Sequence, residues 1–304
     1  MVTAPTSPTA EDFRAAMAEV PQIVHTASGP FEYAERGHGE AILSIHGSQG
    51  GWDQGLVAAE HLRLNGYRII APSRPGYLGT PLSTGRTFAQ QGDALAALLD
   101  ALEIERIHVI AVSGGGPAAY ELAARHGRRI SKLVQVDAVC LTDHGPSAIA
   151  QAGAQAAAQD FLLKAVIWLL RHATKPTLTT LLRSFGTYTR RAASERAAVL
   201  AALPGRTAWL EATLAASLGV ARRRQGMRND FTVSTPAPLE RITCPTLIVH
   251  GRSDKVVPPT HADHAHEHIA GSELYWMDGS HLAFFLEAAD TAPAYVAHWF
   301  RDSR

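Results

Sequence analysis

Residues 107–126, IHVIAVSGGGPAAYELAARH, are the part of the sequence that decides the fold. The stretch begins with IHVIAV, which is apolar apart from His108 and rich in β-branched residues, and it predicts a buried strand. Ser113 and three glycines follow, and a helical pattern begins directly after them. A strand that turns tightly into a helix is the repeating unit of a doubly wound α/β sheet.

Ser113 is the candidate nucleophile at this turn. A tight strand-to-helix turn exposes the hydroxyl and aims backbone N–H groups at developing negative charge. The pattern A-x-S-x-G departs from G-x-S-x-G only at Ala111, by one methyl group. The alternative is a phosphate-binding glycine loop, but the G-x-G-x-x-G spacing and a following lysine are both missing. We therefore predict Ser113 as the nucleophile and the N–H of Gly114 as one oxyanion donor.

Strand and helix patterns alternate over most of the chain, which predicts a mainly parallel, doubly wound sheet flanked by helices. The expected strands are residues 23–26, 31–35, 41–45, 67–71, 107–112, 133–136, 246–249 and 274–277. The expected helices are residues 11–19, 54–64, 87–102, 118–125 and 283–300.

The alternation stops in the middle of the chain. From about residue 147 to residue 227 the sequence is rich in Ala, Leu and Arg and shows no clear strand. Helix breaks are expected at Pro176, Gly186, Pro204 with Gly205, and Gly226. We predict a core domain of residues 1–143 and 239–304, with residues 144–238 inserted as a helical cap.

Composition excludes several classes of protein. The hydrophobic fraction is 46% and the charged fraction 18%, as in ordinary globular chains. Lys plus Arg and Asp plus Glu are 28 each, so we expect no nucleic-acid partner. Two distant cysteines, Cys140 and Cys244, make no disulfide framework. The N-terminus lacks a secretory pattern, and the apolar stretch 161–170 is too short for a bilayer, so we expect a cytoplasmic protein with no membrane partner.

A second glycine-rich loop, IHGSQGG at residues 45–51, follows the expected strand 41–45. Loops at the carboxyl ends of parallel strands border the ligand crevice of such sheets. We predict the backbone N–H of Ser48 as the second oxyanion donor; a simple flexible turn is the alternative. His46 is a possible base, but we expect it to support the loop.

The acid and the base are expected further along the chain. Asp254 follows a buried strand, and His281 lies in a loop between the last strand and the last helix. Histidine suits a general base, and a carboxylate fixes its tautomer. The chain order Ser113, Asp254, His281 is that of a hydrolase triad on an α/β sheet. Asp137 is the second choice of acid, and Asp278 is too near His281 in sequence to orient it well.

Five segments together resemble the α/β-hydrolase fold superfamily. They are IHGSQGG, APSRPGYLGT, AVSGGGPAA, HGRSDKVVP and GSHLAFF, and the resemblance spans roughly residues 23–300 with the cap region unmatched. The resemblance implies a central eight-stranded, mostly parallel sheet, a helical lid and a Ser-Asp-His triad that needs no cofactor and no metal. It also implies that RPGYLGT, which follows a central strand, lines the cleft.

The expected reaction is hydrolysis of a carboxylic ester or related acyl bond in a small-molecule substrate with an apolar acyl part. Within the same fold, lactone, thioester, amide or carbon–carbon cleavage and perhydrolase chemistry stay open. A serine at position 113, where an aspartate would be needed, argues against dehalogenase and epoxide hydrolase chemistry. A non-catalytic ligand-binding protein on this scaffold is the alternative outside enzymes.

Two charged clusters remain. Histidines at 261, 264, 266 and 268 are potential metal ligands, but without a tetrahedral set we expect a solvated helix between His261 and His268. Arginines at 222, 223, 224 and 228 are expected to form a solvated face, with an anion-binding patch from Arg222 to Arg224 as the alternative.

Overall fold

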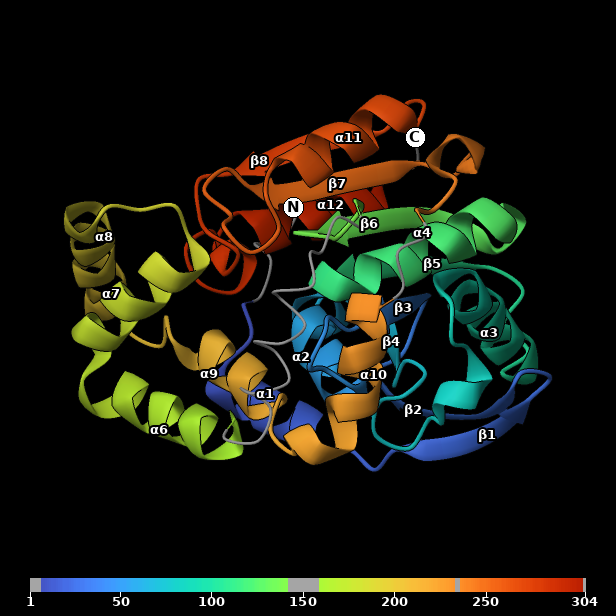
Figure 1. Ribbon diagram of the computed structural model, residues 1–304, viewed down its shortest axis with the longest axis horizontal. Coiled ribbons are helices and arrows are strands. Elements are labelled where there is room, and N and C mark those ends of the chain that lie inside the picture. The colour runs from blue at the N-terminus through green and yellow to red at the C-terminus, as the bar shows by residue number, and fades with distance from the viewer. Residues whose placement is uncertain (1–6, 142–158, 233–235, 303–304) are drawn as a thin grey trace.

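The computed structural model describes residues 7–141, 159–232 and 236–302, and an eight-stranded sheet runs through it (Figure 1). Its strands are β1 (Gln22–Thr26), β2 (Gly29–Arg36), β3 (Ala41–Ile45), β4 (Arg68–Pro72), β5 (Ile107–Val112), β6 (Ile130–Val136), β7 (Thr246–Gly251) and β8 (Glu273–Met277). Their order is β1-β2-β4-β3-β5-β6-β7-β8. β2 is antiparallel to both neighbours, and the other pairs are parallel, which confirms the expected sheet.

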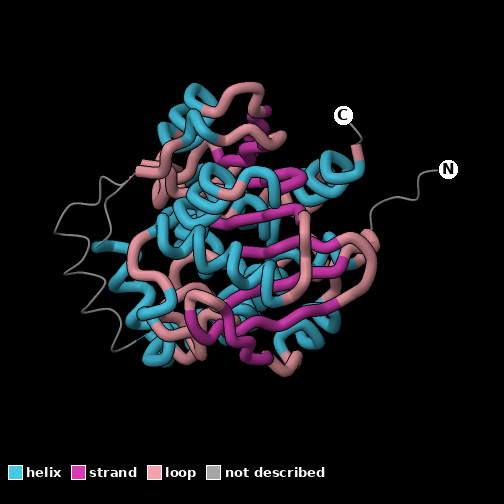
Figure 2. The backbone as a smooth tube through the Cα atoms, turned by 90° about the vertical axis from the view of Figure 1, so that its right-hand side faces the viewer, coloured by secondary structure: helices cyan, strands magenta, loops and turns pink. Residues whose placement is uncertain are grey.

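Helices cover both faces of the sheet. Successive strand residues point to opposite sides, so the buried strands present apolar side chains to both faces. Ile110 joins the apolar cluster on one face, while Val109 and Ala111 join the cluster on the other. The first face packs on α2 (Trp52–Arg63) and α12 (Ala292–Arg301), with α1 (Ala10–Met17) against α2. The second packs on α3 (Phe88–Ala101), α4 (Gly116–Arg125) and α11 (Thr260–His268). Figure 2 shows the strands side by side with helices around them.

Between β6 and β7, the described residues form five further α-helices. They are α6 (Gln159–His172), α7 (Thr174–Phe185), α8 (Arg190–Ala202), α9 (Ala208–Ala215) and α10 (Val220–Thr232). α7 and α8 lie at one end of the molecule (Figure 1). α10 lies near α2, where Arg223 pairs with Asp53, and it contacts α6 through a hydrogen bond from the Val220 N–H to Asp160 (3.2 Å). Apolar residues of α7 and α8 pack on Leu282 and Leu286, which follow β8. The predicted cap limits of 144 and 238 stay a prediction, and residue 144 is outside the described residues.

Two of the expected helix breaks in this insertion are wrong. α7 begins at Thr174, so Pro176 lies in its first turn, where the missing N–H of proline has no helical partner to lose. Gly226 lies inside α10. A Cβ atom at Gly226 would be 2.1 Å from Cδ2 of Tyr77, so this glycine serves close packing and does not end the helix.

The expected helix 283–300 is also wrong, because the structure divides it. Residues Ala283–Phe285 form a 3₁₀ turn, and α12 begins only at Ala292 with Pro293 in its first turn. Other 3₁₀ turns are Leu82–Thr84, Ser113–Gly115, Gly127–Arg129 and Leu239–Arg241. None of the helices in the described part of the chain combines the length and the apolar character that crossing a bilayer requires.

Candidate active site

Ser113 lies where β5 turns into α4, at the carboxyl edge of the sheet. Its φ is +50°, in the left-handed region that costs a non-glycine residue on the order of 1–3 kcal/mol. A hydrogen bond from the Val139 N–H to the Ser113 carbonyl (2.9 Å) fixes the turn to the chain after β6. The strained turn leaves the serine side chain half-buried.

The structure brings His281 and Asp254 to Ser113 from the loops after β8 and β7. Nδ1 of His281 lies 2.6 Å from Oδ2 of Asp254, and Nε2 lies 3.1 Å from Oγ of Ser113. An ionised Asp254 carboxylate can only accept hydrogen bonds, so Nδ1 of His281 carries the proton. Nε2 of His281 is then free to accept a hydrogen bond from the Ser113 hydroxyl. Hydroxyl, imidazole and carboxylate therefore touch in series.

Backbone groups hold the acid and the base in place. Oδ1 of Asp254 accepts hydrogen bonds from the N–H groups of Val256 (2.8 Å) and Val257 (2.9 Å). The His281 N–H donates to the carbonyl of Phe185 (3.2 Å), and the two rings stack at 6.5 Å with an interplanar angle of 11°. The end of α7 thus supports the histidine directly.

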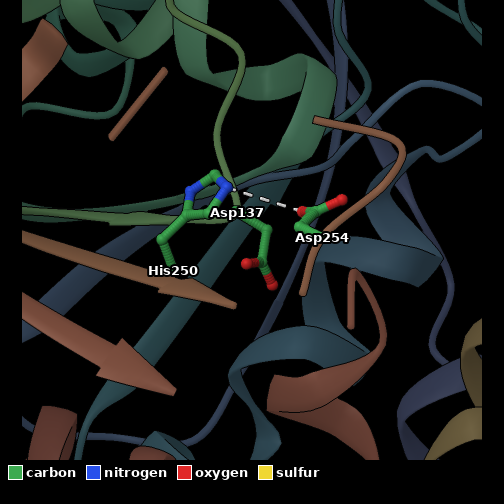
Figure 3. Close-up of side chains that lie close together, drawn as sticks. All are labelled: Asp137, His250 and Asp254. Atoms are coloured by element: carbon green, nitrogen blue, oxygen red, sulfur yellow. Dashed lines mark ion pairs between the residues drawn. The ribbon is translucent and has the colours of Figure 1, made fainter. Parts of the chain in front are cut away.

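Asp137, the second choice of acid, lies beside Asp254 (Figure 3), and it is Asp254 that hydrogen-bonds the His281 ring. Its Oδ1 accepts from the Gly251 N–H (2.8 Å). Burial, together with the nearby charge of Asp254, raises the pKa of Asp137 well above its usual range. The side chain therefore holds its proton under conditions where an ordinary aspartate is ionised. Asp278 faces outward instead.

Asp137, His250 and Asp254 offer ligand-type atoms within 4.8 Å of one another (Figure 3). Burial lowers the pKa of His250, so the ring is neutral, and its Nε2 donates to the carbonyl of Val257 (2.9 Å). The 3.6 Å approach of Nε2 to Asp254 is then a contact between a neutral ring and a carboxylate. Both oxygens of Asp254 already accept hydrogen bonds, so we assign the group to support of the acid and not to a metal.

The expected oxyanion donors belong to two turns that adjoin each other. A Cβ atom on Gly114 would lie 2.1 Å from Oγ of Ser48 and 3.0 Å from its backbone N. Gln49, with φ of +72°, turns the chain sharply after Ser48. The structure thus brings Ser48 and Gly114 together next to Ser113.

His46 supports this loop, and both of its ring nitrogens are hydrogen-bonded to groups other than Ser113. Its Nε2 accepts from the Arg74 N–H (2.9 Å), so Nδ1 carries the hydrogen and donates to the carbonyl of Gly47 (2.6 Å). Complete burial, helped by the charge of Arg74, holds the pKa of His46 well below its usual range. The ring is therefore a neutral structural element.

Two carboxylates around the site, Glu287 and Asp230, were not predicted from the sequence. Oε2 of Glu287 accepts from the Ser280 N–H (3.0 Å), which steadies the loop of the histidine, and Oε1 accepts from the Tyr188 hydroxyl (2.6 Å). In the sequence, only the position of Glu287, six residues after His281, could have indicated this role. Asp230 of α10 accepts a hydrogen bond from the Ser48 hydroxyl (2.8 Å) over a separation of 182 residues, and no motif marks it.

The two charged clusters differ from expectation. His261 is buried, and its Nδ1 accepts from the N–H groups of Cys140 and Leu141 (both 3.0 Å), so this end of the histidine cluster is not solvated. Arg223 is also buried and pairs with Asp53 (2.6 Å). One residue of each predicted solvated face therefore turns inward to a specific partner.

Comparisons with known proteins agree with this fold. The family described as "alpha/beta hydrolase fold" matches residues 40–288. The chain is 31% identical over 275 residues to an uncharacterized hydrolase, YcgS, of Bacillus subtilis, covering 86% of this chain and 92% of the relative. It is 27% identical over 233 residues to a 2-hydroxy-6-oxononadienedioate/2-hydroxy-6-oxononatrienedioate hydrolase of Cupriavidus pinatubonensis, covering 72% of each. An alpha/beta hydrolase fold protein from Nakamurella multipartita superposes with a TM-score of 0.79 at 32% identity, over 92% of this chain and 98% of that one.

Proposed function

The chain belongs to the α/β-hydrolase fold family, and from this premise we propose that it is a serine hydrolase that cleaves a carboxylic ester or related acyl bond. One observation carries the proposal: Ser113, His281 and Asp254 touch in series, at 3.1 Å and 2.6 Å. The hydrolases among its relatives support an enzyme of this family. The substrate we propose is a small molecule with an apolar acyl part.

In the first half of the reaction, Nε2 of His281 takes the proton of the Ser113 hydroxyl while Oγ attacks the carbonyl carbon. Asp254 keeps the proton of Nδ1 on the far side of the ring and stabilises the imidazolium. The N–H groups of Ser48 and Gly114 donate to the oxyanion. The ester bond then breaks, and the leaving alcohol takes the proton from Nε2.

In the second half, a water molecule attacks the acyl-enzyme. Nε2 of His281 accepts one proton of the water as its oxygen bonds to the acyl carbon. The same N–H groups hold the second oxyanion. The bond to Oγ of Ser113 breaks, the serine regains its proton from His281, and the carboxylic acid leaves.

A second candidate is hydrolysis of a carbon–carbon bond beside a ketone. The similarity to a hydrolase named for a 2-hydroxy-6-oxo dienedioate favours it over the lactone, thioester, amide and perhydrolase alternatives. The same three side chains would serve, so the difference lies in the substrate pocket and not in the triad. A panel containing both p-nitrophenyl esters and a 2-hydroxy-6-oxo dienoate distinguishes the two.

The decisive experiment is covalent labelling of the full chain with a fluorophosphonate, read by mass spectrometry. We expect the label on Ser113, no label on the Ser113→Ala variant, and full label on a Ser184→Ala control on the exposed side of α7. Wild-type turnover of p-nitrophenyl esters should disappear with Ser113→Ala. Labelling that survives Ser113→Ala contradicts the assignment, and inertness toward both substrate classes favours the ligand-binding alternative.

A further inference from the structure

Asp230 lies at the centre of a buried polar cluster beneath the Ser48 loop. It belongs to α10, and its side chain is 5% exposed. The Arg74 guanidinium donates to both of its oxygens, from Nη1 to Oδ1 (2.9 Å) and from Nη2 to Oδ2 (2.6 Å). Oδ2 also accepts from the hydroxyls of Tyr77 (2.7 Å) and Ser48 (2.8 Å). The Asp230 carboxylate, which belongs to an inserted helix, therefore accepts four hydrogen bonds from residues of the core.

The electrostatics of the cluster fix the direction of these hydrogen bonds. Arg74 is fully buried, and burial opposes its charge, but the charge of Asp230, the Tyr77 side chain and the hydrogen bonds to both together outweigh burial and raise the pKa of Arg74. Burial and the charge of Asp230 also raise the pKa of Tyr77 well above its usual range, so its hydroxyl keeps its proton. Every partner thus donates to Asp230, and hydrogen bonds to a charged acceptor are the stronger kind.

The cluster holds the Ser48 loop on both sides of Gly47. On one side, Arg74 donates from its backbone N–H to Nε2 of His46 (2.9 Å) and from Nε to the His46 carbonyl (3.2 Å). On the other side, Asp230 accepts from the Ser48 hydroxyl. The ion pair therefore sets where the Ser48 backbone N–H lies relative to Gly114.

We propose that Asp230 is a positioning residue for the oxyanion, acting through the Ser48 hydroxyl and through Arg74. The inference rests on the proposed function, in which the Ser48 N–H donates to the oxyanion. Its consequence is that one half of the oxyanion site is assembled by α10, although the insertion contributes no member of the triad.

A second ion pair on the same helix provides a matched control. Arg223 donates to both oxygens of Asp53, from Nη1 to Oδ1 (3.0 Å) and from Nη2 to Oδ2 (2.6 Å). This pair also ties α10 to the core, with side-chain exposures of 4% and 15%. Within the described residues neither partner hydrogen-bonds Ser48 or His46. If the Arg74–Asp230 pair only attached α10 to the core, disrupting either ion pair should have the same effect on kcat.

The test compares Asp230→Asn, Ser48→Ala, the double variant and Asp53→Asn, with kcat, KM and melting temperature measured on the best p-nitrophenyl ester. Removing an oxyanion donor outright costs about 10²–10³ in kcat, so its misplacement by Asp230→Asn should cost about 10–100-fold, with KM changed less than about threefold. Ser48→Ala, which leaves the ion pair intact, should lower kcat by about tenfold with an unchanged melting temperature. The double variant should be no worse than Asp230→Asn, because the two changes act along one path.

Asp53→Asn should lower the melting temperature but keep kcat within about threefold of wild type. Equal kcat losses in Asp230→Asn and Asp53→Asn would reduce Asp230 to a structural clamp and overturn the inference. Multiplying losses in the double variant would also overturn it. If Asp230→Asn does not fold, Ser48→Ala alone decides, and an unchanged kcat refutes the proposal. A wild-type chain that is neither labelled at Ser113 nor active refutes the proposed function itself, and this inference with it.

Discussion

Replacing His61 with phenylalanine should remove a large part of the acid sensitivity of this fold. His61 lies in α2 with 2% of its surface exposed, and its ring packs against Trp209 and Phe284, both at 5.5 Å. Burial lowers the pKa of His61 from 6.5 to about 3. A cavity of about 40 Å³ borders the ring, so a phenyl ring has room without overpacking.

The sign and size of the effect follow from proton binding. Below pH 6.5 the unfolded chain takes up a proton at His61, whereas the folded chain does not until the pH approaches 3, so acid favours unfolding over this window. One pKa unit corresponds to about 1.4 kcal/mol. His61 should therefore lower the free energy of unfolding by about 1.4 kcal/mol at pH 5.5 and about 2.7 kcal/mol at pH 4.5, relative to pH 7.5.

Urea unfolding of wild type and His61→Phe at pH 7.5, 5.5 and 4.5 measures this directly. Both proteins contain His46 and the other buried histidines, so the difference between the two curves isolates His61. The gap between them should widen by the amounts given as the pH falls. Parallel curves would show that His61 binds protons equally in both states, and the reasoning from burial would then be wrong.

Other predictions concern the site and its packing. Asp254→Asn should lower kcat on the order of 10⁴-fold, whereas Asp137→Asn should keep it within about threefold. The pKa of Asp137 is raised in the folded state, so the free energy of unfolding of the wild type should fall relative to that of Asp137→Asn as the pH rises from 4 to 8. Urea unfolding of both proteins at the two pH values measures this difference, and the opposite trend would contradict the assignment. Gly226→Ala should destabilise the fold by about 1–3 kcal/mol, because the added methyl group clashes with Tyr77. Gly127→Ala is the control and should leave the melting temperature unchanged, because its methyl group would make only an ordinary van der Waals contact. Equal melting temperatures for the two variants would contradict the packing argument.

The sheet could be predicted from the sequence because buried parallel strands leave short, mostly apolar runs. Residues 107–112 are the clearest case, since all six are buried and the predicted strand matches β5. The order of Ser113, Asp254 and His281 carried the candidate triad in the same way. Each of them follows its own strand, and parallel strands bring those ends to one edge.

What local patterns could not predict depends on contacts between distant segments. Gly226 looks like a helix break, and only its contact with Tyr77 explains why a glycine lies inside α10. Asp230 lies in a polar helical segment with no motif, and its partners Ser48 and Arg74 are 182 and 156 residues away. Arg223 likewise looks solvated until Asp53 is placed beside it.

The two ion pairs of α10 bear on how this protein can be recombined with its relatives. A chimera that exchanges α6 through α10 as one block keeps both pairs only if the other parent carries an aspartate at position 230 and an arginine at position 223. Without Asp230 the buried Arg74 would lose its partner, and breaking a buried pair costs about 3–5 kcal/mol. A junction placed between α9 and α10 keeps both pairs within one parent. We therefore expect hybrids joined there to keep the Ser48 loop in place even when the other parent lacks these two residues.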